Sequence, residues 1–293
     1  MEGFGQGMKL RAIEQKSVKR RMSKSKLFFS FIGFCVSFGF LFPYIAMFLI
    51  ALKPKSDISD MPPTYLPKTW VWANFLNVFH ELPFAMYLRN TLIISLSTMI
   101  LGLLVSVPAG YYLARNNFRG RSAFMVIVLI TQMFAPTTLL IGIYREMTKL
   151  NLLNSFLGLI LINTAFNLAF SIWILSSFFK TIPLEIEEAA AIDGCSRWQT
   201  FRKISLPLAL PGIVTTSIFI FIAAWNEYVV AYTLAQSPTV QPFSVGLALL
   251  TGYYEVQWNY LFAGSLIAII PVIILFSSIQ KYLVSGLTAG SVK

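Results

Sequence analysis

The feature that most constrains the fold of this chain is a series of long apolar runs separated by short polar segments. An α-helix needs about 20 mostly apolar residues to cross the hydrocarbon core of a bilayer. Six such spans are predicted, at Leu27–Leu52, Asn90–Ala114, Ser122–Tyr144, Asn154–Phe179, Leu208–Ala235 and Trp258–Val284. Hydrophobic residues make up 56% of the 293 residues and charged residues only 12%, which excludes an ordinary soluble domain. We therefore predict an all-α polytopic membrane protein.

The two ends of the chain differ from the spans that they flank. Residues 1–26 carry eight basic residues, and the apolar run that follows is too long for the hydrophobic region of a signal peptide. We expect simple charge anchoring at an anionic membrane surface, with a helix lying on that surface as the alternative. The predicted organisation is a basic tail at 1–26, a membrane domain at 27–284 and a short tail at 285–293.

The distribution of Lys and Arg residues predicts the orientation of the spans. If the N-terminus is cytoplasmic, the cytoplasmic segments hold seventeen of the 23 basic residues and the outer segments hold six. Cytoplasmic loops of membrane proteins are enriched in Lys and Arg. We therefore expect both termini and the polar segment at 180–207 to be cytoplasmic.

A polar island interrupts the apolar runs between Lys180 and Pro207. Pro183 suits the first turn of a helix, and the acidic residues after it are favoured near a helix N-terminus. Gly194 is a natural turn residue, and Ser196 can cap a second short helix that Pro207 ends. The pattern predicts a helix-turn-helix with an apolar surface for binding another protein. The residues expected on that surface are Ile186, Ala189, Ala190, Trp198 and Phe201.

The same island resembles a motif of a known transporter family. Glu188-Ala189-Ala190, Asp193-Gly194, Phe201, Ile204 and Leu206-Pro207 stand in the register of the EAA loop of ATP-binding cassette (ABC) importer permeases. The C-terminal residues Gly286–Lys293 are similar to the tail of the smaller permease subunit of maltose-type importers. The resemblance implies the six-helix, type I importer architecture, with the EAA loop as a coupling helix-turn-helix docked on a cytoplasmic ATPase.

The resemblance also assigns roles within the island. Glu188 would pair with a basic residue of the ATPase groove, and Gly194 would set the turn between two short helices. Cys195 stands where the family usually has a small residue such as alanine, which is a minor departure. The implied ATPase-coupling residues are Glu187, Glu188, Ala189, Ala190, Asp193, Gly194, Trp198, Phe201, Ile204 and Pro207.

Polar side chains within the spans mark a candidate translocation pathway, because such groups are costly in a bilayer and face a cavity or another helix. Glu227 is the only ionisable residue deep within a predicted span, and it is the candidate pathway or gate residue. The alternative is an interhelical hydrogen bond that only packs the bundle. Pro136 predicts a kink in the third span. The candidate pathway residues are Gln132, Asn163, Asn167, Asn226, Glu227 and Tyr228.

The last predicted outer loop, residues 236–257, contains tyrosines and no Lys or Arg. In maltose-type importers the equivalent loop of the smaller permease reaches the sugar cleft of the binding protein. The resemblance therefore makes Tyr253, Tyr254 and Glu255 candidate binding-protein contacts. Tyrosines at a membrane interface are equally expected without such a role.

The sequence contains no phosphate-binding loop, metal-ligand cluster or nucleophile elbow. We predict a non-catalytic permease subunit with no cofactor or metal of its own, since ATP and Mg²⁺ would be bound by partner ATPase subunits. The resemblance implies a sugar substrate, in first place an oligosaccharide of the maltose type, with an acidic oligosaccharide such as alginate as a second candidate. The alternative is an ion-coupled secondary transporter, which would need coupling carboxylates within the spans.

The resemblance further implies a set of partners in the bacterial inner membrane. They are a homologous larger permease subunit, two ABC ATPase subunits, an extracytoplasmic solute-binding protein and membrane lipid. Nucleic acid is not expected, because the basic residues flank the spans and do not form one patch interleaved with aromatic residues.

Overall fold

The computed structural model describes residues 24–60, 62, 64–252 and 256–289 of the chain. These residues form helices, and no β-strand occurs within the described ranges; one isolated bridge joins Thr251 and Val256. The chain divides into two compact units, Met1–Met47 and Phe48–Lys293. Most of helix α2 (Lys24–Ala51) lies in the first unit, and all later helices lie in the second.

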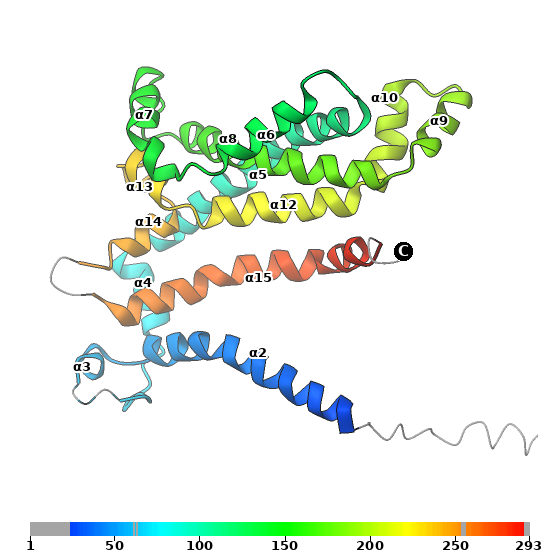
Figure 1. Ribbon diagram of the computed structural model, residues 1–293. Coiled ribbons are helices and arrows are strands. Elements are labelled where there is room, and N and C mark those ends of the chain that lie inside the picture. The colour runs from blue at the N-terminus through cyan, green and yellow to red at the C-terminus, as the bar shows by residue number, and fades with distance from the viewer. Residues whose placement is uncertain (1–23, 61, 63, 253–255, 290–293) are drawn as a thin grey trace, which may run out of the picture. The chain divides into compact units, whose positions relative to one another are not determined.

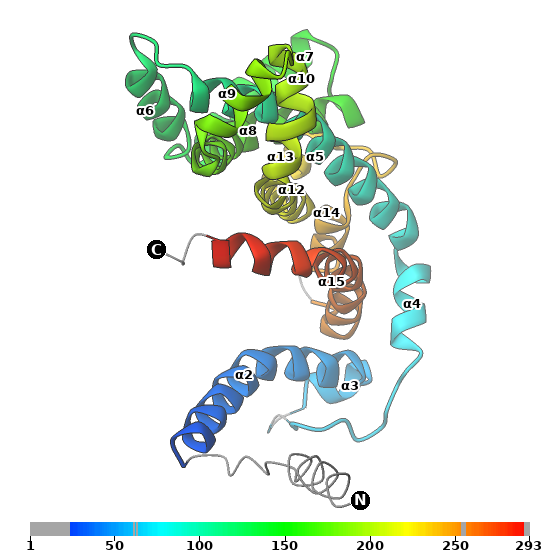
Figure 2. The same ribbon diagram turned by 90° about the vertical axis from the view of Figure 1, so that its right-hand side faces the viewer.

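The second unit is built on four long helices, which Figure 1 shows in colour order. They are α5 (Phe84–Arg115), α8 (Phe156–Thr181), α12 (Leu210–Trp225) and α15 (Trp258–Ala289). The shorter helices are α3 (Lys55–Ile58), α4 (Asn74–Glu81), α6 (Arg121–Thr131), α7 (Pro136–Lys149), α9 (Leu184–Ile192), α10 (Arg197–Thr200), η1 (Phe201–Ser205), α11 (Leu206–Leu208), α13 (Val229–Leu234) and α14 (Phe243–Ala248). Within this unit α5 packs against α8 and α12, and α15 packs against α12 and α4 (Figure 1, Figure 2).

Four single helices in the described residues are long and apolar enough to cross a membrane, and two bent helix pairs raise the number to six if each pair is one span. The single helices are Phe28–Ala51, Phe84–Arg115, Phe156–Thr181 and Trp258–Ser278. The bent pairs are Arg121–Thr131 with Pro136–Lys149, at 93°, and Arg197–Leu208 with Leu210–Trp225, at 73°. The chain therefore offers four to six candidate spans.

Two predicted spans are not continuous helices. The third, Ser122–Tyr144, breaks between α6 and α7, where Ala135 is extended (ψ 135°) before Pro136. A residue before proline avoids the helical conformation because the proline ring clashes with it, so a break replaces the predicted kink. The fifth, Leu208–Ala235, is interrupted after Trp225 and resumes as the short helix α13.

The face of α5 that packs against α8 carries small residues. A Cβ placed on Gly110 would lie 2.8 Å from the Cβ of Leu175 and 3.0 Å from the backbone nitrogen of Ser176. Small side chains allow helix backbones to approach closely in membranes. Buried small residues recur along α5 every three or four positions, at Thr91, Ser95, Thr98, Gly102, Ser106 and Gly110, and Gly102 faces Ile220 of α12.

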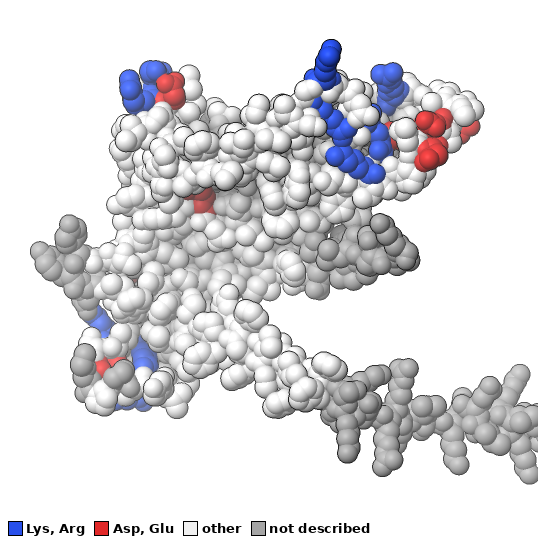
Figure 3. Space-filling view, in the orientation of Figure 1, with Lys and Arg blue, Asp and Glu red and all other residues white. Residues whose placement is uncertain are grey.

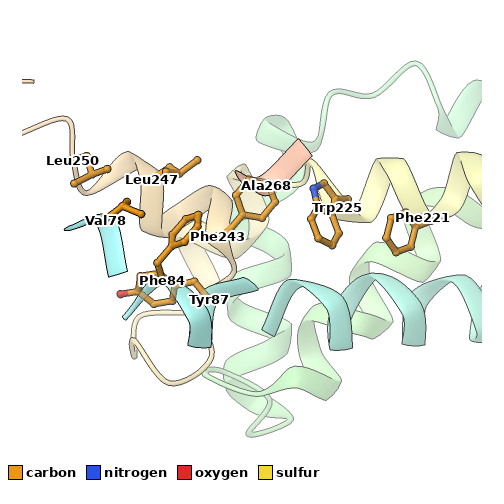
Figure 4. Close-up of a cluster of buried hydrophobic side chains, with 9 residues drawn as sticks. All are labelled: Val78, Phe84, Tyr87, Phe221, Trp225, Phe243, Leu247, Leu250 and Ala268. Carbon is orange, nitrogen blue, oxygen red and sulfur yellow. The ribbon is translucent and has the colours of Figure 1, made fainter. Parts of the chain in front are cut away.

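Apolar clusters join the helices at each end of α5. Near its N-terminus, Phe84 and Tyr87 pack with Trp225 of α12 and Phe243 of α14, as Figure 4 shows. Near its C-terminus a second cluster contains Val107, Leu175, Phe179, Ile182, Phe201 and Ala209. Figure 3 shows charged side chains gathered near the helix ends, with a largely uncharged surface between them. This distribution suits a bundle that crosses a bilayer.

Candidate functional site

A helix-turn-helix occupies the predicted polar island, and we call residues 184–208 the elbow. Helix α9 ends at Ile192, and Gly194 then adopts a left-handed conformation (φ +85°), which strains residues other than glycine. Ser196 begins α10 with a reciprocal cap, in which its Oγ accepts from the Gln199 N–H (3.3 Å) and Gln199 Oε1 accepts from the Ser196 N–H (2.8 Å). The turn and the cap are both local consequences of the sequence.

The second half of the elbow differs from the prediction. The second helix runs through α10, η1 and α11 and ends at Leu208, one residue past Pro207, before a 73° bend into α12. The segment Phe201–Ser205 is a π-helix, and the Leu206 N–H donates to the carbonyl of Phe201, five residues earlier. Pro207 has no N–H to donate, so the wider turn before it continues the helix without requiring that bond.

Glu187 is the one buried charged residue of the elbow, all of which the structure describes. Its Oε1 lies 2.8 Å from Nη2 and 2.9 Å from Nε of Arg115, at the end of α5. Ser205 of η1 donates to the same oxygen (2.7 Å), and the Tyr111 hydroxyl donates to Oε2 (3.0 Å). Arg115 also donates to the carbonyl of Ile182 (3.1 Å). One carboxylate thus connects α9, α5 and η1.

The environment of Glu187 favours its ionised form. Burial would raise the pKa of this carboxyl, but hydrogen bonds from Arg115 and Ser205, with the positive charge of Arg115 and the Tyr111 hydroxyl, outweigh that effect. The pKa of Glu187 is therefore lowered from its usual value.

Aromatic rings surround this ion pair. The Tyr111 ring lies 5.3 Å from that of Phe179 and 4.8 Å from that of Phe201. Phe201 in turn lies 5.4 Å from Trp198, whose side chain is exposed on the elbow. A continuous series of packed rings therefore connects the elbow surface to α5 and α8.

The polar residues of the predicted spans form mostly local hydrogen bonds. Asn163 donates to the carbonyl of Leu159 (2.9 Å), and Asn167 donates to that of Asn163 (2.8 Å), both within α8. Gln132, at the end of α6, donates to the Phe166 carbonyl of α8 (2.8 Å). Asn226 is exposed, and its side chain donates to the Ile222 carbonyl (3.0 Å) at the end of α12.

Glu227 lies at a helix break and not deep within a continuous helix, contrary to the prediction. Its two carboxylate oxygens accept from the N–H groups of Val230 (2.7 Å) and Ala231 (2.9 Å), so it caps α13. The Ser244 hydroxyl donates to its carbonyl (2.7 Å). Both oxygens therefore accept from backbone N–H groups of the helix that follows. Glu227 and Asn163 do line one small cavity.

No group of three or more His, Cys, Asp or Glu residues in the described part of the chain could hold a metal ion.

The comparisons with known proteins bear on this architecture. Residues 106–289 match the model of a family described as the binding-protein-dependent transport system inner membrane component. The chain belongs to this family of transport permeases.

Several characterised permeases are similar to this one over most of their length. It is 36% identical over 253 residues to the sulfoquinovosyl glycerol transport system permease protein SmoH of Agrobacterium fabrum, covering 86% of this chain and 89% of SmoH. It is 34% identical over 256 residues to the trehalose/maltose transport system permease protein MalG of Thermococcus litoralis, covering 86% and 91%.

Solved structures share the fold of this permease. A chain of a bacterial ABC transporter involved in the import of the acidic polysaccharide alginate matches with a TM-score of 0.71 at 28% identity, covering 89% of this permease and 98% of that chain. A chain of the MetNI methionine ABC transporter matches with a TM-score of 0.52 at 17% identity, covering 73% and 96%, and shows the fold alone. The fold is that of type I ABC importer permeases.

The structure places the predicted coupling residues of this permease in two groups. The exposed ones are Glu188, Ala189, Asp193, Gly194, Trp198 and Pro207. Glu187, Ala190 and Phe201 are buried within the chain, and Ile204 is half-buried. Ala190 and Phe201 were expected on the apolar docking surface, but they face the chain's own core, and Phe201 belongs to the cluster at the end of α5.

Sequence reasoning missed several residues in the elbow and in the end of α5 beside it. Ile192 is 87% exposed and shares a helix face with Glu188, four positions earlier. That spacing was visible in the sequence. Arg115, Tyr111 and Ser205 carried no such signal, because only the tertiary fold brings them to Glu187. Tyr253, Tyr254 and Glu255, the candidate binding-protein contacts, lie outside the described residues.

Proposed function

We propose that this chain is one of two permease subunits of a sugar-importing ABC transporter, and that it forms half of the translocation pathway. The support is its similarity, over 86% of its length, to permeases named for sugar transport, together with the shared fold of the alginate importer. The companion would be a homologous larger permease. A solute-binding protein would deliver the sugar on the outer side.

The elbow is proposed to be the EAA loop that docks on an ATPase subunit. Leu184, Glu188 and Ile192 recur every four residues on one exposed face of α9, and Trp198 is exposed on α10. An apolar helix face with a central carboxylate suits a groove that carries a basic residue. Two ATPase subunits would bind ATP and Mg²⁺, and their closure would move the elbows and open the pathway alternately to each side.

The proposed topology has six spans with both termini cytoplasmic. It counts the bent pair α6 and α7 as one span, and it takes α12 as the main helix of the fifth span, with α10, η1 and α11 in the cytoplasmic elbow. The excess of basic residues in the proposed cytoplasmic segments supports this orientation. The proposed pathway residues are the six that the sequence analysis named, and two of them, Asn163 and Glu227, line one small cavity. We also propose that the binding protein contacts Tyr253, Tyr254 and Glu255.

The proposed substrate is an oligosaccharide. The similar permeases include the diacetylchitobiose uptake system permease protein DasC of Streptomyces coelicolor, at 34% identity, and the trehalose/maltose permease already described. The alginate importer keeps an acidic oligosaccharide as a second candidate. An ion-coupled secondary transporter is disfavoured, because both oxygens of Glu227, the only carboxylate deep within the predicted spans, are engaged in capping α13.

The Glu188→Lys variant tests this proposal. The chain would be expressed with the transport proteins encoded beside it and purified through an affinity tag, and the attached ATPase would be quantified by mass spectrometry. We expect Glu188→Lys to release the ATPase or abolish sugar-stimulated hydrolysis, because reversing one charge of an interface pair costs about 2–5 kcal/mol. Uptake into energised vesicles should be sensitive to vanadate and insensitive to protonophores.

The matched control is Glu185→Lys, which makes the same charge reversal on the same helix at another exposed position. It should leave the ATPase attached. Full assembly and stimulated hydrolysis in Glu188→Lys would contradict the docking role. Uptake that collapses with a protonophore would contradict the ABC mechanism as a whole.

A further inference from the structure

The elbow contains two adjacent glutamates with opposite environments. Glu188 is exposed, whereas the Glu187 side chain is only 9% exposed and its partner Arg115 only 11%. Successive residues of a helix point about 100° apart, so Glu187 contacts the end of α5 while Glu188 remains exposed at the cleft beside it. We propose that Glu187 and Arg115 form an internal clamp, which makes the elbow and α5 move as one rigid body when the ATPases move the elbow.

The clamp is built so that both oxygens of Glu187 are engaged. Arg115 and Ser205 donate to one oxygen, and Tyr111 donates to the other. Charge-assisted hydrogen bonds are strong, and they are screened little when both groups are buried. Because Arg115 also holds the Ile182 carbonyl just before α9, the clamp fixes both the start of α9 and its first turn.

Apolar packing holds the Phe201 end of the elbow against α5, but it does not fill the space between α9 and α5. An open cleft of about 490 Å³ lies between them, lined by Tyr112, Asn116, Glu188, Ala191 and Arg197 among others. Because this cleft is open, no side chains there would prevent α9 from tilting toward α5. The ion pair at the border of the cleft therefore sets the angle between α9 and the end of α5.

Beyond the clamp the rigid body extends into the bundle. Tyr111 packs against Phe179 of α8, and α5 and α8 approach to backbone contact at Gly110, one residue before Tyr111. A displacement of the elbow would thus be transmitted to α5 and α8 together, because the two helices are closely packed against each other. Glu187 is a positioning residue in this account, and it does not contact the ATPase.

This inference rests on the proposed role of the elbow, and the experiment separates the two. Glu187→Gln, Arg115→Gln and Glu188→Gln would each be reconstituted in proteoliposomes as the full transporter with its binding protein. ATPase retention, ATP hydrolysis and sugar uptake would be measured for each variant. We expect Glu187→Gln and Arg115→Gln to retain the ATPase and hydrolyse ATP, while the sugar transported per ATP falls about tenfold. Glu188→Gln should instead weaken ATPase retention.

A distance measurement tests the clamp directly. Spin labels at Leu104→Cys on α5 and Glu185→Cys on α9, both exposed positions, would be placed in a chain with Cys35 and Cys195 replaced by alanine. We expect one narrow distance distribution with Glu187 present and a broad one in Glu187→Gln. An unchanged distribution together with normal transport per ATP would overturn the clamp. ATPase release by Glu187→Gln to the same extent as by Glu188→Gln would overturn it as well, since Glu187 would then act at the docking surface. Normal ATPase retention in Glu188→Gln would count only against the proposed docking role.

Discussion

The close approach of α5 and α8 at Gly110 gives a prediction whose size follows from the structure. In Gly110→Ala the new methyl group would lie 2.8 Å from the Leu175 Cβ and 3.0 Å from the Ser176 nitrogen. Carbon atoms in contact prefer about 3.5–4.0 Å, so the helices must move apart by several tenths of an ångström or more. Neither neighbouring atom can rotate away, because one is a Cβ and the other belongs to the backbone.

The expected cost is that of overpacking a core, about 1–3 kcal/mol. Replacing glycine by alanine within a helix stabilises by about 0.5–1 kcal/mol, which leaves a net destabilisation of about 0–2.5 kcal/mol. Gly142 of α7 is the matched control, because a Cβ there meets nothing within 4 Å. Gly142→Ala should therefore stabilise the chain by about 0.5–1 kcal/mol. Both variants gain the same stabilisation from replacing glycine by alanine in a helix. Their free energies of unfolding should therefore differ by the overpacking cost alone, about 1–3 kcal/mol.

The assay is thermal unfolding of the purified transporter in lipid nanodiscs, with both variants heated at one scan rate because membrane complexes often unfold irreversibly. The apparent midpoint of Gly110→Ala should lie below that of Gly142→Ala by roughly 2–12 °C, since about 1 kcal/mol shifts the midpoint of a chain of this size by about 2–4 °C. If Gly110→Ala raised the midpoint as much as Gly142→Ala, the inference that these helices are in backbone contact would be refuted.

Two further predictions concern the acidic residues. The folded-state pKa of Glu187 is lowered, so its contribution to stability is present above the unfolded carboxyl pKa of about 4.3 and is lost as the pH falls through the folded value. The spin-label distance across the clamp should therefore stay narrow at neutral pH and broaden only in acid, and a distribution that broadens between pH 6 and 7 would contradict this. Glu227→Gln should lower the midpoint of unfolding by removing one of two capping acceptors, at a cost of about 0.5–2 kcal/mol. If Glu227 also lines the pathway, uptake per assembled transporter should fall in this variant; normal uptake would restrict Glu227 to its cap.

The helical, membrane-spanning character of the chain could be predicted from the sequence because its causes are local. The fourth predicted span, Asn154–Phe179, corresponds to α8 (Phe156–Thr181) to within two residues at each end. The turn at Gly194 and the cap at Ser196 were likewise predictable, since each depends on residues within one or two turns.

The predictions failed where the outcome depends on packing against distant segments of the chain as well as on the local sequence. Pro136 signalled a kink, but the size of the bend depends on the neighbours of α6 and α7, and it reaches 93°. Pro207 signalled a helix end, and the helix does end one residue later, but the π-helical turn before it was not predicted. Ala190 and Phe201 were assigned to an outer surface on their apolar character alone, which does not tell a docking residue from a core residue.

The sequence by itself determined that this chain is helical, has several apolar spans and carries a polar helix-turn-helix, because apolar length, turn residues and helix caps all depend on consecutive residues. Only the tertiary structure decided which of two adjacent glutamates faces inward. Glu187 and Arg115 are separated by 72 residues, and a buried carboxylate remains charged only where the fold brings a cation and hydrogen-bond donors to it.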